Sequence, residues 1–428
     1  MTKNEFMEKE YNIVPEVAKL VEEAESDAAK DFAKIEEVAS LNQMRVMKAF
    51  YNNRVSEVHF GETTGYGNDD VGRDTLDKVY AEVFGCEDAL VRHSFISGTH
   101  TLSTMLFGVM RPGDTLLYVT GKPYDTLEEV IGITGEPGNG SLADFGVKYE
   151  QIDLAADGYP DRAAIEKRLR AGFVKACVIQ RSKGYAFRPS YTAAEVGEIA
   201  RFIKEISPET VVMADNCYGE FVCDCEPTAL GVDLCAGSLI KNIGGGLAKA
   251  GGYIAGRADL VELCSYRLSS VGIGRECGAS LGFNRSMYQG LFYAPHTVMQ
   301  ALKSASLCAA VYERLGFDTA PHTGEVRGDI IQAVKLGSGE AMAAFCRGIQ
   351  RGAPVDSFVV PEPWDMPGYG DKVIMAAGAF VQGASIELSA DGPMREPYCV
   401  YMQGGLTYES ARLGVAMSVQ CMKEAGII

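Results

Sequence analysis

Short apolar runs alternate with helical stretches through the first two thirds of this chain. Each run has about the length of a buried strand. The runs fall at residues 89–91, 115–119, 147–152, 174–179, 210–214, 234–239 and 252–255. Apolar residues at three- and four-residue spacing predict helices at 15–50, 74–84, 99–110, 161–170 and 193–206. This alternation predicts an α/β domain with a mainly parallel sheet and helices on both of its faces.

The pattern changes near residue 280. A long helical stretch at 284–315 is followed by apolar runs at 326–335, 373–376, 384–389 and 398–402, and by a last helix at 407–424. This order predicts an α+β domain with mostly antiparallel strands. We therefore expect a helical arm at 1–60, a large α/β domain at 61–290 and a smaller α+β domain at 291–428. The loop at 353–371, with four prolines and Trp364, is the segment we expect to be mobile or to cover an active site.

Composition and charge exclude several classes of protein. The formal net charge of -17 argues against nucleic acid or an anionic membrane surface as a partner, because both require a basic face. Neither a membrane span nor a signal peptide is visible in the sequence. The twelve cysteines are scattered, many of them in apolar runs, which is typical of a cytoplasmic protein. With five histidines and no zinc-ligand spacing, we expect no metal site.

An aspartate and a lysine at the ends of two apolar runs carry the candidate chemistry. Asp215 ends the run at 210–214, and Lys241 follows the next run, three residues after Ser238. A pyridoxal phosphate enzyme needs such a pair: the lysine forms a Schiff base with the cofactor, and the carboxylate pairs with its pyridinium nitrogen. Taken alone, Asp215 could equally be a helix N-cap and Lys241 a solvated loop charge.

Other segments have the residues needed to hold the phosphate and the ring of that cofactor. Ser97, Gly98 and Thr99 open a predicted helix, where backbone N–H groups and hydroxyls bind anions, although the same residues also make an ordinary N-cap. Ser238 could place its hydroxyl on the same phosphate. Tyr124 follows a strand and a turn, where its ring could stack on the cofactor, although a lone tyrosine there is more often packing.

Longer motifs resemble a known family. Asp-Asn-Cys-Tyr (215–218), Ser-Leu-Ile-Lys (238–241) and Ser-Gly-Thr (97–99) are similar to motifs of the pyridoxal phosphate enzymes of cysteine and methionine metabolism. The sequence resembles one branch in particular, the methionine γ-lyase-like or aluminium resistance proteins, at residues 65–85, 180–190, 238–256 and 395–407. The resemblance extends from about residue 15 to the C-terminus.

The resemblance implies a fold-type-I pyridoxal phosphate enzyme, a homodimer or homotetramer whose active sites are shared between subunits. It makes Lys241 the Schiff-base lysine and Asp215 the pyridinium partner. The phosphate ligands would be Ser97, Gly98, Thr99 and Ser238, and Tyr124 would be the stacking ring. Arg395 matches the arginine that binds the substrate carboxylate, a role suited to a planar guanidinium. Its alternatives are a salt bridge to Glu396 or loop acids, and a rival arginine, Arg412, expected on a solvated face of the last helix.

One position departs from the family pattern. The lyases usually carry Tyr-x-Arg before the first helix of this region, and both side chains reach the neighbour's phosphate. Here the segment reads Gly-Tyr-Gly-Asn at 65–68. Tyr66 is the candidate catalytic tyrosine, and Arg73 could replace the missing charge.

The resemblance implies carbon–sulfur lyase chemistry on methionine, cystathionine or a similar amino acid, releasing a 2-oxo acid, ammonia and a thiol. Lys241 must be neutral to act as a base, and we expect burial to lower its pKa. The same residues would also serve a cystathionine lyase, a γ-replacement synthase, an aldolase or a transaminase. An alternative from another class is a non-catalytic metal-stress protein.

Overall fold

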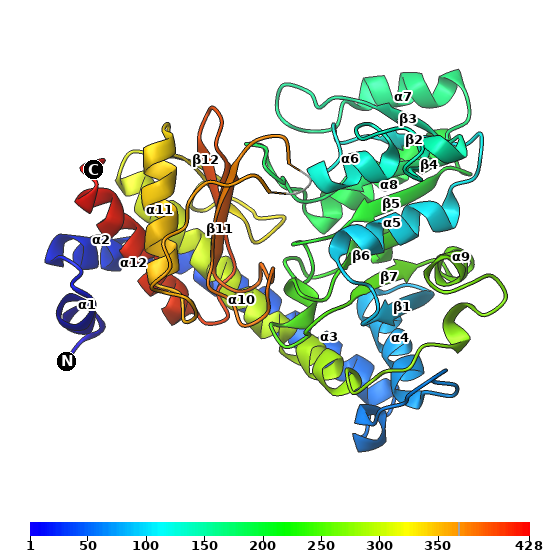
Figure 1. Ribbon diagram of the computed structural model, residues 1–428, viewed down its shortest axis with the longest axis horizontal. Helices are drawn as coiled ribbons and strands as arrows, with labels where there is room; N and C mark the ends of the chain where they lie inside the picture. The colour runs from blue at the N-terminus through cyan, green and yellow to red at the C-terminus, as the bar shows by residue number, and fades with distance from the viewer. Residues whose placement is uncertain (367–368) are drawn as a thin grey trace. The chain divides into compact units, whose positions relative to one another are not determined.

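The computed structural model describes residues 1–366 and 369–428, and its contacts divide the chain into two compact units (Figure 1). The large unit comprises Leu41–Ser182 and Ser190–Tyr293. The small unit comprises Met1–Ser40, Lys183–Pro189 and Ala294–Ile428. Two long helices contribute to both units, α3 (Ala29–Asn52) and α10 (Asn284–Arg314). The domain boundaries proposed from the sequence stay a prediction; in the structure the first forty residues pack with the C-terminal part of the chain.

The large unit is built around a sheet of seven strands within the described residues, in the order β1-β7-β6-β5-β4-β2-β3. The pairs β6–β5, β5–β4, β4–β2 and β2–β3 are parallel, and β7 runs antiparallel to both of its neighbours, β1 and β6. The strands are β1 (Asp88–Arg92), β2 (Thr115–Tyr118), β3 (Lys148–Gln151), β4 (Ala176–Gln180), β5 (Val211–Asp215), β6 (Leu234–Ser238) and β7 (Gly252–Gly256). The helices are α4 (Val71–Phe84), α5 (Gly98–Val109), α6 (Asp125–Ile131), α7 (Arg162–Ala171), α8 (Ala193–Ile206) and α9 (Ala258–Leu268). Single 3-10 turns lie at Glu57–Phe60, Ala143–Phe145, Pro227–Leu230, Asn242–Gly244 and Gly274–Glu276.

Alternate residues of the central strands enter two different cores. In β5, Val211 and Met213 join the core that contains α5 and α9, whereas Val212 and Ala214 join the core that contains α7 and α8. Because successive strand side chains point to opposite faces, this division places helices on both sides of the sheet. The predicted α/β architecture is confirmed.

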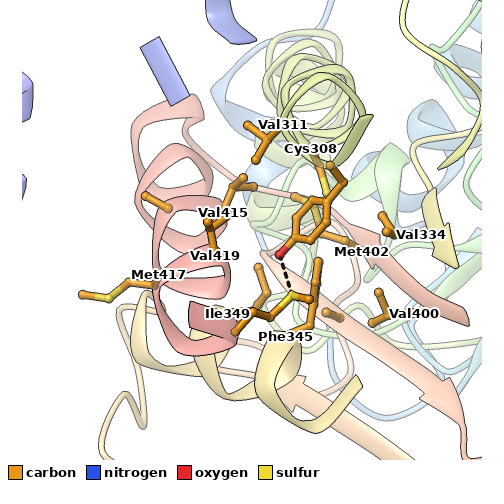
Figure 2. Close-up of a cluster of buried hydrophobic side chains, with 14 of the residues drawn as sticks. Cys308, Val311, Val334, Phe345, Ile349, Val400, Met402, Val415, Met417 and Val419 are labelled. Atoms are coloured by element: carbon orange, nitrogen blue, oxygen red, sulfur yellow. Dashed lines mark hydrogen bonds between the residues drawn. The ribbon is translucent and has the colours of Figure 1, made fainter. Parts of the chain in front are cut away.

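The small unit has an antiparallel sheet in the order β10-β11-β12-β9-β8, counted over the described residues. Its strands are β8 (Asp318–Ala320), β9 (Gln332–Lys335), β10 (Val373–Ala377), β11 (Ser389–Pro393) and β12 (Cys399–Gln403). Its own helices are α1 (Lys3–Tyr11), α2 (Pro15–Asp27), α11 (Gly339–Arg351) and α12 (Tyr408–Glu424). Figure 2 shows apolar side chains of α10, α11, α12, β9 and β12 meeting in one core, among them Val311, Phe345 and Val415. Each fully buried side chain of this size contributes roughly 1.5–3 kcal/mol to folding.

One predicted strand was placed wrongly. The segment 384–389 alternates apolar and polar residues, but the strand begins only at Ser389. Glu387 is buried, and its carboxylate accepts hydrogen bonds from the N–H groups of Phe380 and Val381, both at 2.8 Å. Its side chain therefore organises a turn, and the strand follows it. In the Pro-rich loop, the backbone of Trp364 forms a bridge to Val373, and residues 367–368 of that loop lie outside the described residues.

All twelve cysteines are free thiols, and eight of them are buried. Among the residues that the structure describes, no helix is both long and apolar enough to cross a membrane.

Candidate active site

The carboxyl ends of β5 and β6 bring the candidate aspartate and lysine to one edge of the large sheet. The two strands are parallel neighbours, and Asp215 and Ser238 are their last residues. Lys241 caps the 3-10 turn at Asn242–Gly244 that follows β6. Its Nζ lies 3.9 Å from the centroid of the Tyr218 ring, in the turn after β5. In open α/β sheets, this edge is where ligands bind.

The N-terminus of α5 lies beside the end of β6. Ser97 caps this helix and accepts a hydrogen bond from the N–H of His100 at 3.0 Å. A Cβ on Gly98 would lie 3.4 Å from the Cβ of Ser238 and 3.8 Å from the Sγ of Cys217. The structure therefore brings Gly98 and Ser238 together, with a helix N-terminus and hydroxyls that suit a phosphate.

Thr99 and Tyr124 lie at the starts of neighbouring helices. The Thr99 hydroxyl is 2.8 Å from the hydroxyl of Thr126 in the first turn of α6. Tyr124 directly precedes α6, is partly exposed, and its carbonyl accepts a hydrogen bond from the N–H of Leu127. The Thr99–Thr126 contact therefore brings the start of α6, and with it the backbone of Tyr124, beside the start of α5.

Burial and charge act against each other at both central residues. Burial raises the pKa of the Asp215 carboxyl, and the Lys241 ammonium offsets only part of this. Burial acts to lower the pKa of Lys241, but Cys217, Tyr218, Asp215 and Glu220 outweigh it, so that the net shift is upward. Burial therefore acts in the expected direction, but the net shift of the Lys241 pKa is opposite to the one expected, because acidic side chains surround the amine.

Tyr66 and Arg73 differ in what they offer to a partner. Tyr66 is 79% exposed. Arg73 is buried, and its Nη1 donates to the carbonyls of Gly67 at 2.8 Å and Gly278 at 2.9 Å. Arg73 therefore stabilises the 65–68 turn, and its guanidinium is occupied by hydrogen bonds within its own chain. Within the part of the chain that the structure describes, neither side chain contacts Asp215, Ser238 or Lys241.

The two candidate carboxylate-binding arginines lie in the small unit and have unequal surroundings. Arg395 follows β11, is half-exposed, and its Nη1 lies 2.6 Å from Oδ2 of Asp371. This is the loop-acid salt bridge considered as its alternative. Arg412 is buried, with its Nε 3.0 Å from Oε2 of Glu25. The solvated face expected for Arg412 is therefore wrong, because α12 packs against the N-terminal helices at this point.

Sequence reasoning missed the residues behind the Asp215–Lys241 pair. Arg181 is fully buried, and its Nη1 donates to Oδ1 of Asn216 at 2.8 Å and lies 3.6 Å from Oε2 of Glu226. The Nδ2 of Asn242 donates to the carbonyls of Tyr218 at 2.9 Å and Glu220 at 3.0 Å. The sequence offered one sign of these residues: Glu220 lies in an apolar segment directly after the Asp-Asn-Cys-Tyr motif, where a buried acid needs partners.

Tyr218 has a left-handed backbone, with φ of 71°. This conformation is uncommon for residues other than glycine and is concentrated at functional sites. It agrees with the position of the Tyr218 ring against the Lys241 amine.

Comparisons with known proteins point in one direction. The family model for methionine gamma-lyase matches residues 17–423. The YnbB protein of Bacillus subtilis (strain 168) is 52% identical over 406 residues, covering 95% of this chain and 96% of YnbB. A crystal structure of a carbon–sulfur lyase involved in aluminium resistance, from Clostridium novyi NT, is 49% identical with a TM-score of 0.94, covering 98% of this chain and 99% of that one.

A more distant structure identifies the fold. The pyridoxal-5'-phosphate-dependent protein YhfS from Escherichia coli is 15% identical with a TM-score of 0.60, covering 90% of this chain and 96% of YhfS. At that identity the likeness concerns the fold alone. The fold is that of the pyridoxal phosphate enzymes of fold type I, as the sequence predicted.

Proposed function

We propose that this chain, which belongs to the methionine γ-lyase family, is a pyridoxal-phosphate-dependent lyase that cleaves a carbon–sulfur bond of a sulfur-containing amino acid. The observation that carries the proposal is the convergence of Asp215, Ser238 and Lys241 at the carboxyl ends of β5 and β6, beside the N-terminus of α5.

The residues present fit the cofactor. The α5 N-terminus with Gly98, Thr99 and Ser238 offers backbone N–H groups and hydroxyls to a phosphate, and the absent side chain of Gly98 leaves room for one. Asp215 offers a buried carboxylate to a ring nitrogen, and Lys241 offers an amine. When bound, pyridoxal phosphate would act as an electron sink for charge that develops on the substrate's α-carbon.

The chain's own groups would then carry the proton movements. We assign Lys241 the removal of the proton from the substrate α-carbon and its movement toward the β-carbon. Asp215 would keep a proton on the ring nitrogen, and Tyr124 would cover one ring face. Arg395 would bind the substrate carboxylate with its two-pronged guanidinium.

The same proposal includes a second copy of the chain. Tyr66 is almost fully exposed in its own subunit, which suits a side chain that completes the site of a neighbour in a homodimer or homotetramer. We place the protein in the cytoplasm and assign it amino-acid substrates.

The test combines mapping of the residue that binds the cofactor covalently with an assay of the reaction products. The purified protein should absorb near the visible edge, and borohydride reduction followed by peptide mapping should place the pyridoxyl group on Lys241. The protein should release a 2-oxo acid with a thiol from methionine or cystathionine, or with hydrogen sulfide from homocysteine or cysteine. A Lys241→Ala variant is the control and should do neither.

Two results would contradict the proposal. A pyridoxyl group on Lys183 or Lys249 would refute the lysine assignment. A yellow protein that forms a 2-oxo acid without any thiol or hydrogen sulfide would favour a transaminase. The metal-stress alternative has no support from side-chain clusters, since no group of three metal-ligating residues occurs in the described chain.

A further inference from the structure

Glu220 is a fully buried acid in the turn after β5, and the established motifs assign it no role. Its Oε1 accepts a hydrogen bond from the Tyr253 hydroxyl at 2.8 Å. Tyr253 lies on β7, directly opposite Gly237 of β6. The carboxyl group therefore lies against the strand that leads to Ser238 and Lys241.

The space for this carboxyl group depends on a glycine. A Cβ at Gly237 would lie 2.5 Å from Oε1 of Glu220 and 2.8 Å from the Tyr253 hydroxyl, far inside van der Waals contact. Gly237 therefore makes room for the Glu220–Tyr253 pair. The backbone carbonyl of Glu220 is also held by Asn242, the residue that follows Lys241.

The second oxygen of Glu220 distinguishes it from an ordinary buried hydrogen-bonded acid. Oε2 is buried and has no hydrogen-bond partner among the residues that the structure describes. A buried carboxylate in this condition is unfavourable unless a cation lies close to it. Arg181 is engaged by Asn216 and Glu226, and Lys241 is the other cation whose charge acts on Glu220.

The charged and titratable groups around Glu220 come from several elements. They are Tyr80 on α4, Arg181 after β4, Cys217 and Glu226 after β5, Cys235 on β6, Lys241 before the turn at Asn242–Gly244, and Tyr253 on β7. Burial raises the pKa of Glu220 to about 8, Glu226 acts in the same direction, and Tyr253 and Lys241 oppose it. Glu220 therefore ionises more readily when Lys241 carries its proton.

We propose that Glu220 is a positioning residue of the active site, a buried counter-charge in the turn after β5 whose carboxylate raises the pH up to which the Lys241 nitrogen keeps its proton. The inference rests on the proposed function, because it is read out through the cofactor on Lys241. It divides the acids of the pocket between two tasks, with Asp215 on the ring nitrogen of the cofactor and Glu220 on the Lys241 nitrogen.

The experiment is a pH titration of the absorbance of the bound cofactor, which changes as the Lys241 nitrogen loses its proton. Glu220→Gln keeps the acceptor for Tyr253 and removes the charge. Its titration midpoint should fall by about one to three pH units, the usual effect of a close opposite charge. Tyr253→Phe removes the hydrogen bond that favours the carboxylate, and its midpoint should fall by less.

Tyr80→Phe is the matched control. The Tyr80 hydroxyl is buried and unpartnered among the described residues, and its ring lies 6.0 Å from the Tyr253 ring. Its removal changes the same pocket without changing a carboxylate or its donor, so the midpoint should stay at the wild-type value. Borohydride mapping should show full occupancy of Lys241 in all variants.

Each outcome decides between the two proposals. A wild-type midpoint in Glu220→Gln at full occupancy would overturn the inference and leave the proposed function standing. A wild-type protein without cofactor absorbance would overturn the proposed function itself. If Glu220→Gln does not fold, an unshifted midpoint in Tyr253→Phe overturns the inference.

Discussion

The side chains behind the candidate active site form a buried group of charges. Asp215, Glu220 and Glu226 lie around Arg181 and Lys241; four of the five are buried, and Lys241 is partly buried. In such surroundings, removing one partner leaves the other without compensation, which costs more than the pair contributes. We therefore expect neutral substitutions here to change the ionisation of neighbouring groups as well as their own.

The first prediction at this scale concerns the two arginines of the small unit. Arg395 pairs with Asp371 at an exposed position, where an ion pair is worth roughly 0–1 kcal/mol, so its guanidinium can exchange that partner for a substrate carboxylate. Arg395→Ala should weaken binding of every α-amino acid ligand by about 1.5–3 kcal/mol. Ligand titrations that follow cofactor absorbance would measure this.

Arg412→Ala is the control for that prediction. Arg412 is buried against Glu25, so its removal should lower the Tm and leave ligand affinity unchanged. If Arg412→Ala abolishes binding while Arg395→Ala binds normally, the carboxylate site belongs to α12.

The sequence predicted the residues that lie at strand ends and not those that lie behind them. Asp215, Ser238 and Lys241 could be located because each follows an apolar run, and parallel strands end at one edge of a sheet. Glu220, Tyr253 and Arg181 come together only because β4, β5, β6 and β7 lie side by side in the sheet, an order that no local pattern encodes. The predicted net direction of the Lys241 pKa shift was wrong for the same reason, since separate segments of the chain contribute its acidic neighbours.

At the scale of elements, strong hydrophobic periodicity was a good guide and weak periodicity was not. The helix α8 was predicted at its observed bounds, because it has an apolar stripe and a capping box at Thr192 and Glu195. The strand β11 was misplaced, because its sequence Ser-Ala-Asp-Gly-Pro contains residues that strands disfavour. Pairing with β10 and β12 on both sides overrides that preference.

A prediction at this scale tests how closely α11 and α12 pack. A Cβ on Gly348 would lie 2.2 Å from Cα of Ser418, so Gly348→Ala must push the two helices apart. We expect a loss of about 1–3 kcal/mol in the free energy of unfolding, the usual effect of overpacking. Denaturant unfolding would measure it.

Gly370→Ala is the matched control, because a Cβ there meets nothing within 4 Å among the described residues and the backbone is outside the left-handed region. It should unfold at the wild-type denaturant concentration. Equal stability of both variants would show that α11 and α12 can separate without cost.

At the scale of the whole molecule, one row of apolar side chains is exposed on the surface of α3. Leu41, Met44, Met47 and Tyr51 lie along α3 at three- and four-residue spacing and are 45%, 57%, 55% and 76% exposed. The backbone of Phe292 on α10, a further exposed aromatic, accepts a hydrogen bond from Gln43 of α3. A row of this kind is typical of a protein–protein contact. We expect it to lie between two copies of the chain.

Met47→Glu should therefore lower the mass in solution toward the single-chain value of 46.1 kDa, because a carboxylate is costly to bury in an apolar contact. Light scattering after size separation would measure the mass. Lys167→Glu, at an exposed position on α7, should leave the assembly intact. An unchanged mass in Met47→Glu would place the contact elsewhere.

The buried thiols have a consequence for how opening of the molecule can be observed. Four lie in the small unit (Cys308, Cys346, Cys399 and Cys421) and four in the large unit (Cys177, Cys217, Cys235 and Cys264). Burial raises the pKa of Cys177, Cys264 and Cys308 to about 12, so these thiols are inert while covered. An alkylating reagent reaches each one only when its own neighbourhood unfolds. The native chain thus carries eight internal reporters of local unfolding. Peptide-resolved alkylation rates would show whether its two units open together or separately.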